Sequence, residues 1–318
     1  MAKTGAALTE TAPPALLVVL GPTASGKTEL AHEVALRRNG EIVSADAFAV
    51  YRGLDAGTAK PSREKRAEVP YWGLDLASPR ETYSAGRWAG EARVWIDDIA
   101  GRGRLPILCG GSGFYLSALL EGLPPGAAAD SALRAALEAW GRHRPEAAHR
   151  FLEVNDPVSA GRISPANRRY TLRALEILLT TGGRASDRER PRGWSAGWRI
   201  VKVGIQPSRE DLYARIASRV AGMLDAGWGA EVRRLLEEGI PVEAQAFQAI
   251  GYREVAEWVQ GRAERRETEE KIVAATRQLA KRQRTWFARE SGVEWLSPER
   301  ALAATLARVD GDGTERSG

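Results

Sequence analysis

The chain has 318 residues, of which 43% are hydrophobic, and its 46 Lys and Arg against 41 Asp and Glu give a net charge of +5. This size and composition suit a globular protein with a buried core, while one cysteine, Cys109, and three histidines argue against a disulfide framework and against a zinc site. No apolar run approaches the roughly 20 residues that span a bilayer and no signal-peptide pattern opens the chain, so we expect a cytoplasmic protein without a membrane segment.

The first element is an apolar run that enters the loop GPTASGKT at residues 21–28 and continues into the amphipathic pattern ELAHEVALRR. This order predicts a strand, a phosphate-binding loop and a helix, because Gly21 and Gly26 let the backbone turn its N–H groups toward an anion. Lys27 adds a positive charge, and the Thr28 hydroxyl is placed where a Mg²⁺ ion bridging two phosphates takes an oxygen ligand. We therefore expect this loop to bind a diphosphate or a triphosphate.

A second strand is predicted at residues 41–45, directly before Asp46. At the end of a strand beside the phosphate loop, this carboxylate can act as a general base or bind Mg²⁺ through water. A helix cap or an Asx turn is the alternative interpretation. Residues 52–79, rich in Gly, Pro and charge, predict a binding loop or lid, and residues 83–99 predict a helix.

Residues 105–123 repeat the opening pattern, with an apolar strand at 105–109, the glycine-rich turn GGSG and a helix that begins near Phe114. Two such turns at the carboxyl ends of parallel strands share one crevice. The Ser112 hydroxyl is therefore a candidate ligand contact, with an ordinary turn serine as the alternative.

Residues 124–194 have a helical, Arg-rich pattern without a strand candidate and predict an inserted helical domain. Between residues 122 and 196, twelve Arg and no Lys stand against eight acidic residues, so this span carries +4 of the net charge of +5. A basic insertion on a nearly neutral core favours a polyanionic partner. The alternative is a solvated helical surface whose small excess of positive charge has no function.

After the insertion, alternating residues at 198–206 predict a return to the sheet, and residues 292–298 predict a last short strand. The expected fold is α/β, a parallel sheet of the phosphate-loop NTPase type flanked by helices, with an inserted all-helical domain. Its parts are a disordered N-terminus (1–14), a discontinuous phosphate-loop core (15–121 and 197–308), a helical insertion (122–196) and a disordered tail (309–318).

Two later helical segments carry clustered cations. Arg215 and Arg219 are four residues apart and project from one helix face, where they can clamp a phosphate or pair with nearby acidic residues. In the segment ATRQLAKRQRTWFAR, three cations share another helix face: Arg277, Lys281 and Arg284. An apolar seam with a seven-residue period is expected to back them: Ile272, Leu279 and Trp286. This combination predicts a nucleic-acid-binding helix, with simple surface solubility as the alternative.

Four blocks of the sequence resemble the signatures of the tRNA dimethylallyltransferase family, enzymes that prenylate adenosine next to the anticodon. The blocks are GPTASGKTELA (21–31), SADAFAVYRGLDAGTAKP (44–61), LPILCGGSGFYLSALLEGL (105–123) and ATRQLAKRQRTWF (275–287). With RALEIL at 173–178 they extend over residues 16–298 in the order found in the family.

The resemblance implies transfer of a dimethylallyl group from dimethylallyl diphosphate to the N6 amine of adenosine 37 in tRNAs reading codons that start with U, with release of diphosphate. It makes Asp46 the general base, adds Ser112 and Lys27 as catalytic residues, and places Mg²⁺ as the cofactor at Thr28. The implied partners are the tRNA anticodon stem-loop and dimethylallyl diphosphate, and a monomer is expected. The implied diphosphate-binding residues are Gly21, Pro22, Thr23, Ala24, Ser25, Gly26, Lys27, Thr28, Arg215 and Arg219. The implied tRNA-binding residues are Arg168, Arg277, Gln278, Lys281, Arg282 and Arg284.

The chain departs from the family pattern at a few positions. Ala47 follows the aspartate where Ser is usual, and Ser112 stands in the second glycine turn where Thr is usual. Ser112 keeps a hydroxyl, but Ala47 cannot donate a hydrogen bond, so Asp46 is expected to be less constrained in its orientation. Residues 70–76 and 164–170 also differ, and apart from Arg168 no family contact is carried over to them.

Three other functions share part of this evidence. A phosphate-loop kinase would use ATP but would leave the basic helix and the Arg-rich insertion without a role. An isopentenyltransferase acting on free adenine nucleotide would need no tRNA-binding insertion. A non-enzymatic RNA-binding module would not need Lys27 and Asp46 together.

Overall fold

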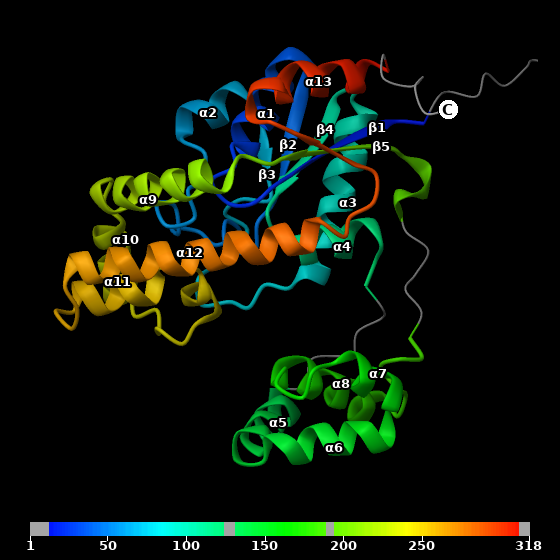
Figure 1. The fold of residues 1–318 in the computed structure, drawn as a ribbon, viewed down its shortest axis with the longest axis vertical. Helices are drawn as coiled ribbons and strands as arrows, with labels where there is room; N and C mark the ends of the chain where they lie inside the picture. Colours follow the sequence, from blue (N-terminus) through cyan, green and yellow to red (C-terminus); the bar gives the residue numbers. More distant parts are fainter. Residues whose placement is uncertain (1–12, 124–130, 189–193, 312–318) are drawn as a thin grey trace, which may run out of the picture. The chain divides into compact units, whose positions relative to one another are not determined.

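The computed structural model describes residues 13–123, 131–188 and 194–311. The chain divides into two compact units (Figure 1): Met1–Leu120 with Trp194–Gly318 form unit 1, and Glu121–Gly193 form unit 2. Among the described residues, every helix is too short or too polar to cross a lipid bilayer.

Unit 1 is built on a six-stranded parallel sheet. Its strands are β1 (Ala15–Leu20), β2 (Gly40–Ala45), β3 (Tyr71–Trp72), β4 (Leu105–Gly110), β5 (Arg199–Ile205) and β6 (Val293–Leu296). Their order across the sheet is β3-β2-β4-β1-β5-β6, so the carboxyl ends of β2, β4 and β1 are neighbours. This topology confirms the predicted α/β fold class, whereas β3 was missed because it lies in the segment predicted as a loop.

Helices flank this sheet on both faces (Figure 1). The α-helices of unit 1 are α1 (Lys27–Arg37), α2 (Arg63–Glu68), α3 (Ala85–Gly101), α4 (Gly113–Leu120), α9 (Arg209–Asp225), α10 (Trp228–Glu237), α11 (Tyr252–Val259), α12 (Arg265–Phe287) and α13 (Pro298–Asp310). Two 3₁₀ helices, η1 (Trp194–Gly197) and η2 (Gln245–Gln248), complete the unit.

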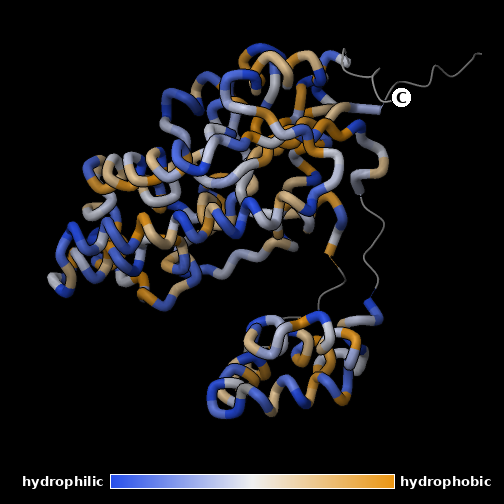
Figure 2. Tube along the Cα trace, viewed as in Figure 1, coloured by the Kyte–Doolittle hydropathy of each residue, from blue (hydrophilic) through white to orange (hydrophobic). Residues whose placement is uncertain are grey.

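The core of unit 1 follows from the apolar character of the central strands, which Figure 2 colours as hydrophobic. Leu17 and Val19 of β1 pack in one cluster with Val34 of α1 and Ala301 of α13. Leu16, which points to the opposite face of the sheet, is also fully buried. Burial on both faces is typical of parallel strands covered by helices, and it fixes the strand ends that carry the site.

A buried carboxylate links β2 to the neighbouring edge of the sheet. The side chain of Glu41 is 1% exposed and accepts hydrogen bonds from Arg102 (2.5 and 2.9 Å), Arg104 (2.6 Å) and the indole N–H of Trp72 (2.8 Å). The hydrogen bonds from Arg102 are the largest cause that lowers the pKa of Glu41 to about 2, while burial opposes them. Glu41 is therefore a structural ion-pair centre and lies on the strand before Asp46.

We expect Glu41→Gln to lower the free energy of unfolding by about 3 kcal/mol at pH 7, because the pKa falls from 4.5 to about 2 on folding. A depressed carboxyl pKa stabilises the fold above pH 4.5, and this contribution is lost as the pH falls toward 2. In denaturant unfolding, the free energy of unfolding should fall less steeply between pH 7 and pH 2 in Glu41→Gln than in wild type. Glu270→Gln, at an exposed carboxylate, is the control, and equal slopes in wild type and Glu41→Gln would contradict the expectation.

Unit 2 is a small helical bundle with its own core. Its helices are α5 (Ser131–His143), α6 (Pro145–Asn155), α7 (Pro157–Arg162) and α8 (Arg168–Thr181). Leu152 and Leu175 are fully buried at the centre of an apolar cluster drawn from all four helices. The buried Asp156 accepts hydrogen bonds from the N–H groups of Ser159 and Ser186, both at 3.0 Å, and so joins α7 to the segment after α8.

The observed boundaries differ from the predicted ones at four places. Glu121, predicted to belong to the core, is part of unit 2, and residues 194–196, predicted to belong to the insertion, are part of unit 1. Pro14, predicted to be disordered, accepts a hydrogen bond from the N–H of Arg199 at 2.9 Å. Helix α13 continues to Asp310, two residues into the predicted tail, because its apolar face packs on the sheet. Residues 1–12 and 312–318 lie outside the described residues.

Candidate active site

The phosphate loop at residues 21–28 joins β1 to α1 through residues with unusual backbone angles. Ala24 and Gly26 have φ values of 63° and 97°, and the Ser25 N–H donates to the carbonyl of Pro22 at 3.2 Å. Among the described residues no side chain caps α1, whose first turn therefore presents free N–H groups. The Ser25 hydroxyl is buried and has no hydrogen-bond partner in the described part of the chain. A helix start of this kind is suited to bind an anion.

Two cations and one carboxylate interact electrostatically at this loop. The Lys27 ammonium donates to the Pro22 carbonyl at 3.2 Å, and burial, the largest cause, lowers the pKa of Lys27. Arg219 of α9 lowers this pKa further, whereas Asp46 raises it. Burial also lowers the pKa of Arg219, and Asp46 opposes that shift. Three side chains from α1, α9 and the end of β2 thus form one charged group.

Arg215 approaches the same loop from α9. Its guanidinium lies 3.9 Å from the position that a Cβ atom on Gly26 would occupy, and the side chain itself is exposed. Arg215 and Arg219 therefore both lie near the phosphate loop, as the four-residue spacing on one helix face predicts.

Asp46 is fixed by its own backbone. Its Oδ1 accepts hydrogen bonds from the N–H groups of Phe48 (2.8 Å) and Ala49 (3.1 Å), which is the local turn that the sequence left open as an alternative. These two bonds orient the carboxylate without a side-chain donor at Ala47, and a weaker constraint than in relatives with Ser there stays a prediction. Among the described residues no group donates to Oδ2, which leaves that oxygen able to accept a proton.

The second glycine-rich turn lies beside the end of β2. The Ser112 N–H donates to the carbonyl of Ala45 at 3.3 Å, so Ser112 is held next to the residue that precedes Asp46. A Cβ atom on Gly110 would collide with this same carbonyl. The structure thus places the phosphate loop, Asp46 and Ser112 at the carboxyl ends of three neighbouring strands.

Helix α12 contacts both glycine-rich turns. The side-chain oxygen of Gln283 accepts the N–H of Thr23 at 2.8 Å, and its amide nitrogen donates to the carbonyl of Gly111 at 2.8 Å. A Cβ atom on Gly113 would collide with the indole of Trp286. The glycines of the second turn therefore admit side chains of α12, a role that the sequence interpretation did not give them. Gln283 was quoted within a motif without a function, and the available signal was a polar residue between buried Ala280 and Phe287 on one helix face.

The apolar seam predicted for α12 was wrong at one residue. Trp286 is 40% exposed, and Phe287 is fully buried instead, on the same side as Ile272. Arg277 does not join an exposed cationic row, because its guanidinium packs 4.9 Å from the ring centre of Tyr213 on α9.

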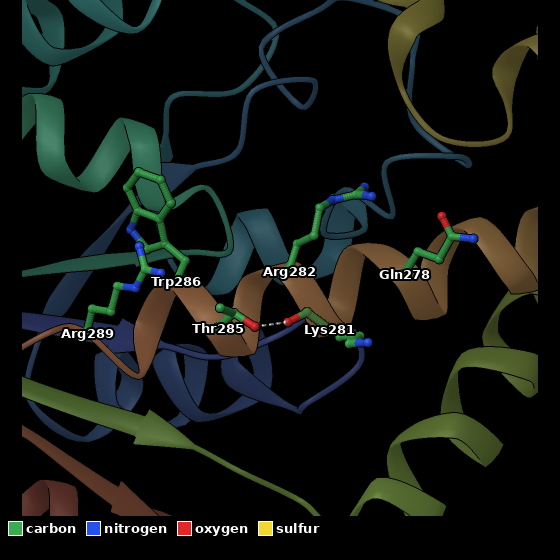
Figure 3. A pocket seen from close by; sticks show the side chains of 6 residues that line it. All are labelled: Gln278, Lys281, Arg282, Thr285, Trp286 and Arg289. Carbon is green, nitrogen blue, oxygen red and sulfur yellow. Dashed lines mark hydrogen bonds between the residues drawn. The ribbon is translucent and has the colours of Figure 1, made fainter. Parts of the chain in front are cut away.

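The outer face of α12 carries an open hollow of about 440 Å³ (Figure 3). It is lined by Gln278, Lys281, Arg282, Thr285, Trp286 and Arg289. Three of the residues implied as tRNA contacts therefore share this face, while Arg277 and Arg284 are half-buried. The remaining implied tRNA contact, Arg168, lies in unit 2, where its guanidinium donates to the carbonyl of Glu138 at 3.0 Å.

The residues at the loop fit Mg²⁺ only in combination with a phosphate ligand. Within the described residues, no group of three or more His, Cys, Asp or Glu side chains is placed to hold a metal ion. The Thr28 hydroxyl, which belongs to the loop, and the Asp46 carboxylate, which interacts with Lys27, nevertheless supply hard oxygen donors. Mg²⁺ commonly takes one or two such protein ligands and completes its shell with phosphate oxygens and water.

A phosphate loop after β1, a carboxylate after β2 and a glycine-rich turn after β4 define an α/β phosphate-loop protein with its site at the carboxyl ends of the strands. The family described as IPP transferase matches residues 49–290, and the family described as isopentenyl transferase matches residues 14–69. The chain therefore belongs to the IPP transferase family, a family of prenyltransferases, and the resemblance stated from the sequence is confirmed.

Individual relatives agree with this assignment over nearly the whole chain. The tRNA dimethylallyltransferase of Thermomicrobium roseum is 44% identical over 286 residues, which are 88% of this chain and 85% of the relative. That of Geobacter sulfurreducens is 41% identical over 283 residues, or 88% and 91% of the two chains.

Solved structures show the same fold. The tRNA delta(2)-isopentenylpyrophosphate transferase of Staphylococcus epidermidis matches with a TM-score of 0.66 at 36% identity, covering 95% of this chain and 100% of that chain. A eukaryotic dimethylallyltransferase acting on tRNA matches with a TM-score of 0.79 over 94% of this chain and 80% of that chain. At 24% identity, this second likeness concerns the fold alone.

Proposed function

We propose that the chain transfers a dimethylallyl group from dimethylallyl diphosphate to the N6 amine of adenosine 37 in tRNAs that read codons starting with U, releasing diphosphate. The observation that carries the proposal is the meeting of Lys27, Arg219 and Asp46 at a phosphate loop that α12 also contacts through Gln283. A diphosphate site, a proton acceptor and a cationic helix are the three elements that prenyl transfer to a nucleic acid requires.

Asp46 acts in this proposal as the general base. The N6 amine of adenine is a weak nucleophile because its lone pair is delocalised into the ring, so removal of a proton during C–N bond formation helps the reaction. Oδ1 of Asp46 is occupied by the Phe48 and Ala49 N–H groups, and Oδ2 is the oxygen that takes the proton. Ser112, on the neighbouring turn, offers its hydroxyl as a hydrogen-bonding group for the adenine in this proposal.

The phosphate loop stabilises the leaving diphosphate. Negative charge grows on the diphosphate as its C–O bond breaks, and Lys27, Arg219 and the N–H groups of the first turn of α1 are placed to neutralise it. Arg215 adds an exposed cation at the edge of the loop. Mg²⁺, when bound, supplies further charge neutralisation, and the Thr28 hydroxyl would hold it.

The acceptor adenosine has to leave the base stack to reach Asp46. Enzymes that act on a base edge generally bind that base unstacked, and they hold the nucleic-acid backbone with cations and aromatic side chains. The hollow on α12, with Lys281, Arg282 and Trp286, offers both kinds of side chain. The monomeric state and the cytoplasmic location stay predictions.

The test is transfer of radiolabelled dimethylallyl groups from the diphosphate to unmodified tRNA that carries adenosine 3′ of the anticodon, with AMP and ADP as competing acceptors. We expect label in tRNA, dependence on Mg²⁺, and loss of label when adenosine 37 is replaced by guanosine. Label only in free nucleotide would assign a nucleotide isopentenyltransferase. Consumption of ATP without transfer of label would identify the protein as a phosphate-loop kinase instead.

A further inference from the structure

Gln283 makes a contact that links the outer face of α12 to the phosphate loop. Its carboxamide uses both ends at once, accepting from the Thr23 N–H and donating to the Gly111 carbonyl, each at 2.8 Å. Thr23 lies in the phosphate loop after β1, and Gly111 lies in the turn after β4 that also carries Ser112. One side chain therefore fixes the separation between the loop and the turn.

This contact leaves little freedom for the carboxamide. A Cβ atom on Gly111 would collide with the Gln283 amide nitrogen, and it would lie 3.6 Å from the Lys27 ammonium. Two residues further on, Gly113 meets Trp286 of the same helix equally closely. Helix α12 thus packs directly against the backbone of the turn.

The same helical turn carries two exposed cations that line the hollow in Figure 3: Lys281, on the side opposite Gln283, and Arg282, about 100° around the helix from it. An α-helix behaves as a rigid rod over a few turns, because each residue is hydrogen-bonded to the next turn. A ligand that immobilises Lys281 and Arg282 therefore immobilises Gln283, which lies one or two residues away.

We propose that Gln283 is a positioning residue that couples tRNA binding on α12 to the arrangement of the phosphate loop. The inference rests on the proposed function and goes beyond it by predicting an interaction between the two substrates. tRNA phosphates that hold α12 in place keep the Gln283 bridge formed, and the bridged loop is preorganised for diphosphate. By thermodynamic reciprocity, the bound donor increases the affinity for tRNA by the same factor.

The experiment measures the dissociation constant of a non-reactive donor analogue, dimethylallyl thiolodiphosphate, with and without saturating unmodified tRNA. We expect wild type to bind the analogue about fivefold or more tightly in the presence of tRNA, the lower end of typical coupling between sites. Gln283→Met, which keeps the length of the side chain but cannot form the bridge, should reduce this ratio to near 1. Gln260→Met, the same change at an exposed glutamine after α11, should keep the wild-type ratio.

Gly111→Ala is a second variant that leaves Gln283 in place. Its new methyl group would displace the Gln283 carboxamide. We therefore expect the ratio of dissociation constants without and with tRNA to fall to near 1, as in Gln283→Met. If Gln283 has a purely structural role, its loss would weaken binding of the analogue equally with and without tRNA. The ratio of the two dissociation constants would then keep its wild-type value. That result, or a wild-type ratio of 1 with both substrates bound, would overturn the inference. Failure of wild type to bind either the analogue or tRNA would instead overturn the proposed function.

Discussion

Asp46→Asn is expected to lower kcat for prenyl transfer about 10²–10⁴-fold, the usual contribution of a general base. Asparagine keeps an oxygen that can accept the Phe48 and Ala49 N–H groups, so the local turn survives. The proton-accepting Oδ2 is replaced by an amide nitrogen that cannot accept a proton. The KM for dimethylallyl diphosphate should not rise, because a negative charge near Lys27 and Arg219 has been removed.

Asp46→Ala separates the chemical role of the carboxylate from its structural one. It should lose as much activity as Asp46→Asn and, since both turn hydrogen bonds disappear, it should also lower the free energy of unfolding by about 1 kcal/mol. Single-turnover rates and denaturant unfolding of both variants provide the comparison. If Asp46→Asn keeps more than a tenth of the wild-type kcat, Asp46 only supports the turn.

Local patterns allowed the strands and the phosphate loop to be predicted from the sequence. The apolar run, the spacing of Gly21 and Gly26 and the amphipathic helix lie within one short segment, and each follows from backbone or side-chain properties of that segment. Strand β3 could not be found in this way, because Tyr71 and Trp72 form a strand only by pairing with the edge of β2.

The error at Trp286 has a geometric cause. A straight α-helix falls about 20° short of a seven-residue repeat at each step, so Trp286, two steps after Ile272, lies about 40° to one side of it. The buried Phe287 and Ala280 lie about 60° and 80° to the other side, so the buried face of the helix is centred away from Trp286. On the same helix Gln283 lies within about 20° of Ile272, since eleven residues make close to three full turns. The sequence therefore contained the information that Gln283 lies on the buried face of α12.

The partners of Gln283 could not be predicted. Its hydrogen bond to Thr23 connects residues 260 positions apart, and its bond to Gly111 connects residues 172 apart. Such contacts depend on where α12 lies in the finished fold, which no local pattern in the chain encodes. The same holds for the electrostatic group of Lys27, Arg219 and Asp46, whose members come from three separate elements.

Lys27→Met is expected to lower kcat/KM for dimethylallyl diphosphate about 10²–10³-fold, as removal of one preorganised charge at a developing anion does elsewhere. In the absence of ligand, we expect the same variant to have a higher melting temperature than wild type. Burial lowers the pKa of Lys27 below its usual 10.5, which means that folding disfavours the charged form. The cost of burying the charged ammonium is fully present below the pKa that Lys27 has in the folded state, and it disappears as the pH rises toward 10.5. The difference in melting temperature between Lys27→Met and wild type should therefore shrink over this pH range.

The measurement is thermal unfolding of wild type and Lys27→Met from pH 7 to pH 10.5, with and without inorganic diphosphate and Mg²⁺. Wild type should gain stability from diphosphate by mass action, whereas the variant should gain little because its affinity is lost. Lys271→Met, at an exposed lysine paired with Glu267, should match wild type in both respects. A lower melting temperature in Lys27→Met would mean that the hydrogen bond from Lys27 to Pro22 outweighs the cost of burial. An undiminished response of the variant to diphosphate would show that the Lys27 ammonium does not contribute to anion binding, and would remove Lys27 from the proposed site.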